Sequence, residues 1–105
     1  MLKQATIYCP VICTSEAMGA RWTPLILRDL LLYGARRFQD LQDSVSGIAP
    51  TTLSNCLKAL EQHGIVERRF YTQHPPRAEY VLTEKGHDLG PVVRAMRDWG
   101  EKYEN

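Results

Sequence analysis

The feature that most constrains this chain is a change of hydrophobic period at Gly64. Before it, over residues 51–63, leucines recur at three- and four-residue spacing, which predicts a helix with one apolar stripe. The leucines of the stripe are Leu53, Leu57 and Leu60. After Gly64, over 65–71 and 78–82, the pattern changes to two-residue alternation, which predicts an antiparallel β-hairpin. The sequence therefore places a helix directly before a two-stranded ribbon.

The predicted helix carries hydrogen-bonding side chains on the face opposite its leucines. Such groups can donate to DNA phosphates or to base edges. Glu61 is the one acidic residue of the helix and lies beside the apolar stripe, whereas an ordinary solvated face more often mixes Glu with Lys. We expect this face to contact DNA, and a merely solvated helix is the alternative. The expected contact residues are Thr51, Thr52, Ser54, Asn55 and Lys58.

The predicted hairpin has a basic and stiff end. Residues 72–77 separate its strands, and this segment is expected to be too long for a two-residue turn. Pro75 and Pro76 stiffen the segment without offering donors to a strand partner. Arg77 at the edge of the loop and Arg69 on a strand are expected to reach a phosphate backbone.

Two further helices are predicted before the leucine stripe. Residues 23–33 are apolar nearly all round, which predicts a central buried helix. Arg36 and Arg37 open the next helix, near the place where a backbone phosphate would lie in a DNA complex. The expected helix-turn-helix covers about 37–63, and the hairpin at about 65–82 forms its wing.

Both ends of the chain are expected to be helical. A weakly apolar helix is predicted at about 10–19, and a second at about 84–103 is expected to be kinked or interrupted at Gly90 and Pro91. The compact core leaves little to cover these helices, so we assign them to a dimer interface. The expected interface residues are Val11, Met18, Val92, Met96, Trp99 and Tyr103. The predicted fold class is α+β, mainly α: one winged helix-turn-helix domain over 1–105 with N- and C-terminal dimerisation helices.

The charge and composition fit a cytoplasmic protein with a local DNA-facing patch. The net charge is only +1, but residues 21–77 hold eight basic and five acidic groups, while 78–105 hold four and six. The middle of the chain is therefore mildly basic, which is compatible with DNA binding. No apolar run approaches the ~18 residues of a membrane span, and no signal peptide is visible, so no membrane partner is expected.

The three cysteines suggest thiol chemistry rather than a disulfide framework, because their number is odd and no export signal is visible. Cys9 precedes Pro10 at the expected start of the first helix, and a helix N-terminus favours the reactive thiolate. A sensing thiol and an inert, partly buried one both remain open for Cys9. Cys13 lies one helical turn later, where a disulfide to Cys9 would be strained. The cysteines and histidines lack finger-like spacing, so we expect no metal and no cofactor.

Two other classes of function are alternatives to DNA binding. An enzyme is not expected, because the sequence contains neither a recognisable nucleophile and base nor a glycine-rich phosphate loop. A winged-helix module that binds only other proteins is the stronger rival. Replacing Lys58 and Arg77 discriminates, since a partner surface on the terminal helix would be indifferent to both changes.

With these elements placed, the chain resembles the HxlR-type family of bacterial transcription regulators, relatives of the MarR group. The resemblance covers nearly the whole length, and the order and spacing of its motifs make it specific. The motifs are CPV at 9–11, GARWTPLILR at 19–28, RRF at 36–38, IAPTTLS at 48–54, LE at 60–61, GIV at 64–66, PPRAEY at 75–80 and LTEKG at 82–86.

The resemblance implies a homodimeric, sequence-specific DNA-binding transcription regulator. Its two recognition helices would lie in successive major grooves of a palindromic operator. The resemblance also implies thiol oxidation or electrophile modification at Cys9 as a signal, with purely structural cysteines as the alternative. The chain departs from the family in Cys13 and in Cys56, which stands where a basic or polar residue is usual on the recognition helix. These departures leave open which thiol matters and whether the missing charge reduces the affinity for DNA.

Overall fold

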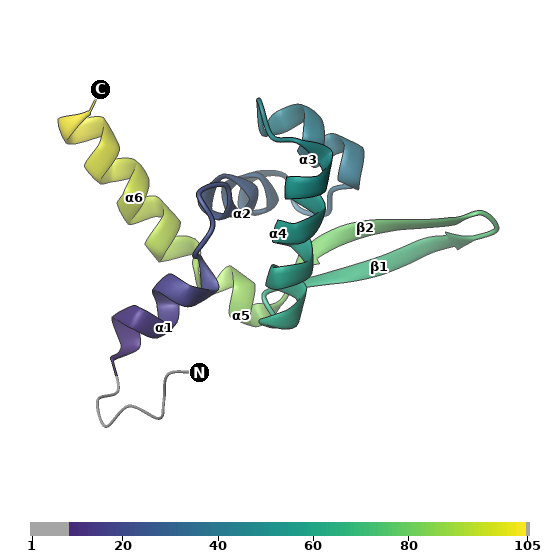
Figure 1. The fold of residues 1–105 in the computed structure, drawn as a ribbon, viewed down its shortest axis with the longest axis horizontal. Helices are drawn as coiled ribbons and strands as arrows, with labels where there is room; N and C mark the ends of the chain where they lie inside the picture. The colour runs from purple at the N-terminus through teal and green to yellow at the C-terminus, as the bar shows by residue number, and fades with distance from the viewer. Residues whose placement is uncertain (1–8, 105) are drawn as a thin grey trace.

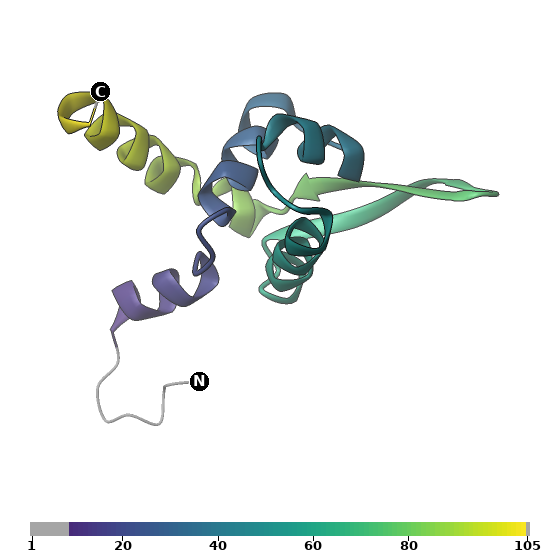
Figure 2. The same cartoon turned by 45° about the horizontal axis from the view of Figure 1, so that its top comes forward.

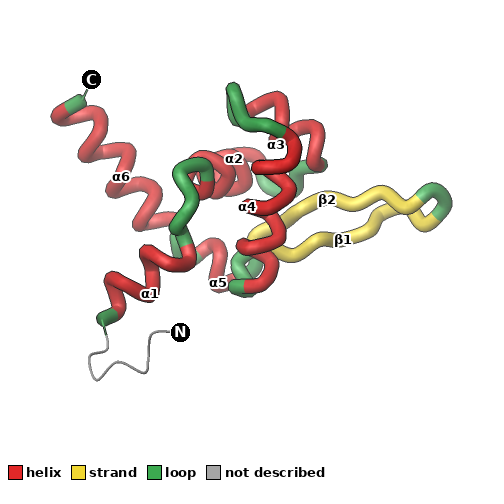
Figure 3. Tube along the Cα trace, viewed as in Figure 1, coloured by secondary structure: helices red, strands yellow, loops and turns green. Residues whose placement is uncertain are grey.

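A computed structural model describes residues 9–104, which form six helices and one two-stranded antiparallel sheet (Figure 1). The elements are α1 (Pro10–Ala17), α2 (Thr23–Tyr33), α3 (Phe38–Ser44), α4 (Pro50–Gln62), β1 (Val66–Gln73), β2 (Pro76–Leu82), α5 (Glu84–His87) and α6 (Gly90–Tyr103). The predicted α+β architecture, mainly helical with a helix-turn-helix and a wing, is confirmed. Figure 3 shows the two strands of the hairpin in yellow among the red helices of residues 9–104.

The core lies between α2, α3, α4 and the base of the hairpin. It is built from the apolar stripes that the spacing predicts, and its members are almost fully buried. They include Ile26, Leu27 and Leu30 of α2, Leu41 of α3, Leu53, Leu57 and Leu60 of α4, and Ile65 and Val66 at the start of β1. Because α4 contributes a continuous stripe to this core, its opposite face is free to meet another molecule.

Helices α1 and α6 extend from the core in a direction opposite to that of the wing. In Figures 1 and 2, α1 and α6 leave the core on one side, and the hairpin projects on the other. The helix-turn-helix lies between them. Within residues 9–104 no helix has the length and apolar character needed to cross a membrane.

The central helix α2 is less buried than its sequence predicts. Ile26, Leu27 and Leu30 are buried, but Leu32 is 66% exposed and Tyr33 is 61% exposed. The expectation of burial on nearly all sides was wrong for the last turn. That turn lies at the edge of the core, and the helix ends at Gly34, whose φ of 78° only glycine adopts readily.

The tip of the hairpin also differs from the prediction. The strands pair as far as Gln73 and Pro76, so only His74 and Pro75 form the turn, and the expected six-residue loop was wrong. Proline is tolerated as the first residue of a strand, which is the position of Pro76. A β-bulge at Tyr71 absorbs the extra residue of β1, and the His74–Pro75 peptide bond is cis.

The predicted interruption of the last helix is confirmed. The short helix α5 ends at His87, and α6 begins at Gly90 with a proline in its first turn. Thr83 caps α5, because its hydroxyl accepts a hydrogen bond from the Gly86 N–H at 3.1 Å. Gly86 itself approaches the Ile65 carbonyl so closely that a Cβ atom would overlap the oxygen.

Candidate DNA-binding surface

Helix α4 is set by signals at both of its ends. Pro50 stands in the first turn, where its missing N–H has no partner to lose, and Gly64 follows the end with a φ of 72°. Lys85 adds a tertiary cap, since its ammonium donates to the His63 carbonyl at 2.8 Å. A cation at this end also favours the helix dipole. The role of Lys85 was not predicted, because its place at the helix end depends on the tertiary fold.

The structure divides the five predicted contact residues of α4 into two groups. Thr51, Asn55 and Lys58 are exposed and follow each other at four- and three-residue spacing, so they share one face. Thr52 and Ser54 are half-buried at the margins of that face. Within residues 9–104, Lys58 forms no ion pair that would neutralise its charge.

Cys56 does not lie on the DNA-facing side of α4. It is 6% exposed and belongs to the core cluster with Leu53 and Leu57. Burial raises the pKa of its thiol, and a hydrogen bond with Thr23 of α2 opposes that rise. Because Cys56 faces inward, it does not take the place of a charged side chain on the exposed face of α4.

The two predicted arginines of the wing differ in their surroundings. Arg69 of β1 faces Glu79 of β2 across the ladder, and its Nη2 lies 3.6 Å from the Glu79 Oε2. Such an exposed pair is weak, but it balances the charge that Arg69 would offer to a phosphate. Arg77 is exposed beside the turn and forms no ion pair within the described residues.

Arg36 is directed into the protein rather than toward solvent. Its Nε lies 3.3 Å from Oδ2 of Asp29, an ion-pair distance without the alignment of a hydrogen bond. Its Nη2 donates to Ser44 Oγ at 2.9 Å, and the side chain is 21% exposed. The phosphate contact predicted for Arg36 conflicts with these internal contacts, so we assign Arg36 to the framework. An acidic residue within an apolar helix, here Asp29, is the sequence signal that could have found this pair.

Arg37 stays exposed at the start of α3. Its backbone N–H donates to Asp40 Oδ2 at 3.0 Å, and its Nε lies 3.7 Å from the same oxygen. The Tyr71 hydroxyl and then the Asp40 carboxylate raise the pKa of the Arg37 guanidinium above its ordinary value. Of the two predicted arginines, Arg37 is the one that the structure leaves at the surface, between α3 and the wing.

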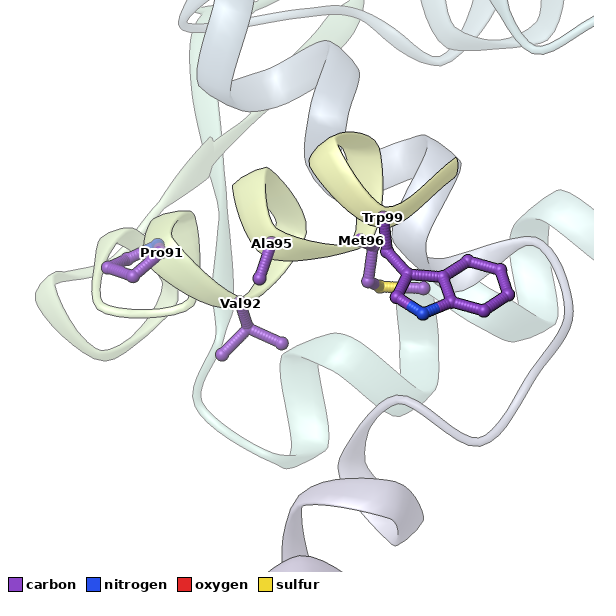
Figure 4. Close-up of a pocket in the computed structure, with 5 residues that line it drawn as sticks. All are labelled: Pro91, Val92, Ala95, Met96 and Trp99. Carbon is purple, nitrogen blue, oxygen red and sulfur yellow. The ribbon is translucent and has the colours of Figure 1, made fainter. Parts of the chain in front are cut away.

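The predicted interface residues gather mainly on α6. Val92, Met96, Trp99 and Tyr103 are exposed at four- and three-residue spacing. A shallow apolar hollow runs along this helix, as Figure 4 shows, and the Trp99 and Tyr103 rings lie 5.3 Å apart. The residues that line the hollow are Pro91, Val92, Ala95, Met96 and Trp99.

The two interface residues predicted on the first helix have different surroundings. Val11 is exposed on α1, as a dimer contact requires. Met18 is half-buried and packs against the core of its own chain. The assignment of Met18 to a dimer interface therefore conflicts with its packing, and we omit it from the proposed interface.

The early cysteines lie at the base of α1. Cys9 is the residue before the helix and is half-buried, and its carbonyl accepts the first-turn hydrogen bond from Cys13 N at 3.2 Å. All three cysteines are free thiols. Within the part of the chain that is described, no group of three or more His, Cys, Asp or Glu side chains could hold a metal ion.

Comparison with known proteins agrees with this arrangement. The HxlR-like helix-turn-helix family matches residues 17–105. The chain is 39% identical over 97 residues to YdeP of Bacillus subtilis, named as an uncharacterized HTH-type transcriptional regulator, and the match covers 92% of this chain and 75% of YdeP.

Among solved structures, the redox regulator HypR in its oxidised form has a TM-score of 0.83 and 36% identity, covering 92% of this chain and 99% of HypR. The reduced form of the transcriptional regulator YodB from B. subtilis has a TM-score of 0.75 and 34% identity, covering 92% and 95%. These relatives are transcription regulators and not enzymes. The chain accordingly belongs to the HxlR-like helix-turn-helix family of transcription regulators.

Proposed function

We propose that this regulator binds a palindromic DNA operator as a homodimer, with α4 in the major groove and the wing on the flanking backbone. The observation that carries the proposal is the exposed strip of Thr51, Asn55 and Lys58 on α4, backed by a buried leucine stripe. Hydroxyl, amide and ammonium groups donate to both phosphates and base edges. Arg77 near the tip of the wing and Arg37 just before α3 are further exposed cations that would contact the flanking backbone.

The homodimer is inferred from α6. Four large apolar residues form one exposed stripe there, and an exposed apolar stripe of this kind marks an interaction site. A second copy of the chain covers such stripes with two-fold symmetry. Two recognition helices related by a two-fold axis read a palindrome, with half-sites about one helical turn apart or a multiple of it.

We further propose that modification of Cys9 by an oxidant or a small electrophile changes DNA binding. Cys9 lies at the start of α1, the helix that we assign to the interface with α6. HypR is named as a redox regulator and is known in oxidised and reduced forms, and YodB is known in reduced and diamide-treated forms. The transfer of a thiol switch to Cys9 is part of our proposal. A regulator acting on DNA is also expected in the cytoplasm.

The first experiment is a titration of the purified protein onto DNA from upstream of its own and adjacent genes, against random competitor DNA. Lys58→Ala and Arg77→Ala are each expected to weaken binding and to lower the slope of log K against log salt by about one unit per protomer. Arg94→Ala makes the same charge change on the face of α6 opposite its apolar stripe, away from both proposed surfaces, and is expected to keep the slope. Equal slopes in all three variants would contradict the proposed DNA surface.

The alternative of a protein-interaction module makes a different prediction. It expects neither DNA preference nor any effect of Lys58→Ala and Arg77→Ala. Specific binding that oxidant abolishes in the native protein but not in Cys9→Ser would support the thiol switch. Binding that oxidant leaves unchanged would retain the regulator and assign Cys9 to packing.

A further inference from the structure

A buried ion pair lies at the root of the wing. Asp29 of α2 is 2% exposed, and the Arg36 guanidinium is its cationic partner at 3.3 Å. Removing one partner of a buried pair leaves an uncompensated charge in the protein interior. Breaking this pair is therefore expected to destabilise the fold more than breaking one of the exposed ion pairs of the wing.

Arg36 joins three elements at this point. Its guanidinium donates to Ser44 Oγ at 2.9 Å and to the Asp40 carbonyl at 3.3 Å, both in α3, and lies 4.7 Å from the Tyr33 ring of α2. Its backbone pairs with Tyr80 of β2 in both directions, with N···O distances of 3.0 and 2.7 Å. The same residue thus holds α2 and α3 through its side chain and the wing through its backbone.

The bridge to Tyr80 ties the backbone of β2 to the segment before α3. The strand is half-buried from Ala78 to Leu82, whereas Arg77 and Pro76 are exposed. Arg77 lies three positions from Tyr80, a span of about 10 Å at the usual rise of a strand. A small change of angle at Tyr80 therefore moves the Arg77 side chain by a distance that matters for a hydrogen bond.

We propose that Arg36, held by Asp29, is a positioning residue that aims the wing so that Arg77 meets the DNA backbone. The inference deepens the proposed function and rests on it. Arg36 itself then makes no phosphate contact. Arg36 affects DNA binding because its backbone bridge to Tyr80 sets the position of Arg77. The effect is therefore detected as a change in the contribution of Arg77 to binding.

The sign of the change in DNA affinity on one substitution distinguishes a positioning role of Arg36 from direct phosphate contact by Arg36. Asp29→Asn removes a negative charge and frees the Arg36 guanidinium, so direct phosphate contact by Arg36 predicts equal or tighter DNA binding. Positioning predicts weaker binding instead. Asp98→Asn on α6 makes the same charge change at an exposed carboxylate and serves as the matched control. Tighter or unchanged binding by Asp29→Asn would overturn the inference.

A double-mutant cycle tests the link to the wing. Arg77→Ala is expected to weaken binding about tenfold per protomer in the native background, the value of one charge-assisted hydrogen bond. In the Asp29→Asn background the same change is expected to cost less than about twofold, because the contact is already lost. An equal cost in both backgrounds would overturn the positioning role while leaving the proposed function intact. No cost in the native background would overturn the wing contact and the positioning role together.

Two measurements keep the test valid if Asp29→Asn folds poorly. Ser44→Ala removes a single hydrogen bond to Arg36 and can replace Asp29→Asn in the cycle, with circular dichroism to verify the fold. Amide hydrogen exchange in the free protein measures the stability of the Arg36–Tyr80 bridge in the absence of DNA. The Tyr80 amide, which donates to the Arg36 carbonyl, is expected to exchange faster in the variant, while the Leu57 amide in α4 is unchanged. Equal Tyr80 exchange would overturn the inference.

Discussion

The Ile65 carbonyl joins the end of the recognition helix to the segment that follows the wing. It accepts hydrogen bonds from the Thr83 backbone N–H at 3.0 Å and from the Thr83 hydroxyl at 3.2 Å. Gly86 lies directly against this oxygen. In Gly86→Ala the new Cβ would overlap the oxygen and lie 2.9 Å from Leu82 Cδ2. Because the obstacle is backbone, it cannot rotate away, and α5 must shift from its place beside α4.

The cost of Gly86→Ala follows from that geometry. Overpacking of a filled site costs about 1–3 kcal/mol, and loss of the backbone hydrogen bond from Thr83 adds about 1 kcal/mol. The better helix propensity of alanine returns at most about 1 kcal/mol. With that return made in full, the expected loss in the free energy of unfolding is about 1–3 kcal/mol. In a domain of this size that lowers Tm by about 4–24 °C.

Thermal unfolding followed by circular dichroism, at one fixed protein concentration, measures this loss. Gly100→Ala in α6 is the matched control, since nothing lies within 4 Å of a Cβ built there. It is expected to leave Tm unchanged or to raise it slightly. If Gly86→Ala and Gly100→Ala had the same Tm, the close approach of α5 to the end of α4 would be refuted.

Three other outcomes are expected. Burial raises the pKa of the Cys56 thiol above 9.0, so the folded state holds a proton that the unfolded state loses. The free energy of unfolding should therefore fall above about pH 9, and in Cys56→Ala a urea titration at each pH should find a smaller fall. Trp99→Ala should weaken the dimer about tenfold or more by sedimentation, because it truncates a large exposed aromatic of the proposed interface. In Cys9→Ser, oxidant should leave DNA affinity unchanged in a gel-shift titration.

The periodicities of the sequence were sufficient for the elements that bury one face. The stripe of Leu53, Leu57 and Leu60 predicted both the helix and its orientation, because only one rotation of α4 buries all three. The alternation after Gly64 also predicted the hairpin, although Val66 is the only buried residue of β1. These patterns succeed where burial decides the structure, and the exposed face of α4 then follows without further information.

Periodicity could not decide the places where partners are distant in sequence. The Asp29–Arg36 pair depends on two helices meeting, and the internal direction of Arg36 cannot be obtained from its neighbours in the chain. The length of the wing depends on the register and on a bulge at Tyr71, which alternation alone does not reveal. The burial of Cys56, in contrast, could be predicted from the sequence, since its spacing of three from Leu53 places it near the buried face of α4.

The distribution of ion pairs limits how this surface can hold DNA. Residues 21–77 carry eight basic side chains, but four of them face a carboxylate: Arg36, Arg37, Arg68 and Arg69. Lys58 and Arg77 are the candidate contact residues that lack such a partner within residues 9–104. Binding without sequence preference is driven by phosphate neutralisation, so few free cations make it weak. Strong binding then requires base contacts from α4 and the combined contribution of two protomers, which is the property that a selective operator-binding dimer needs.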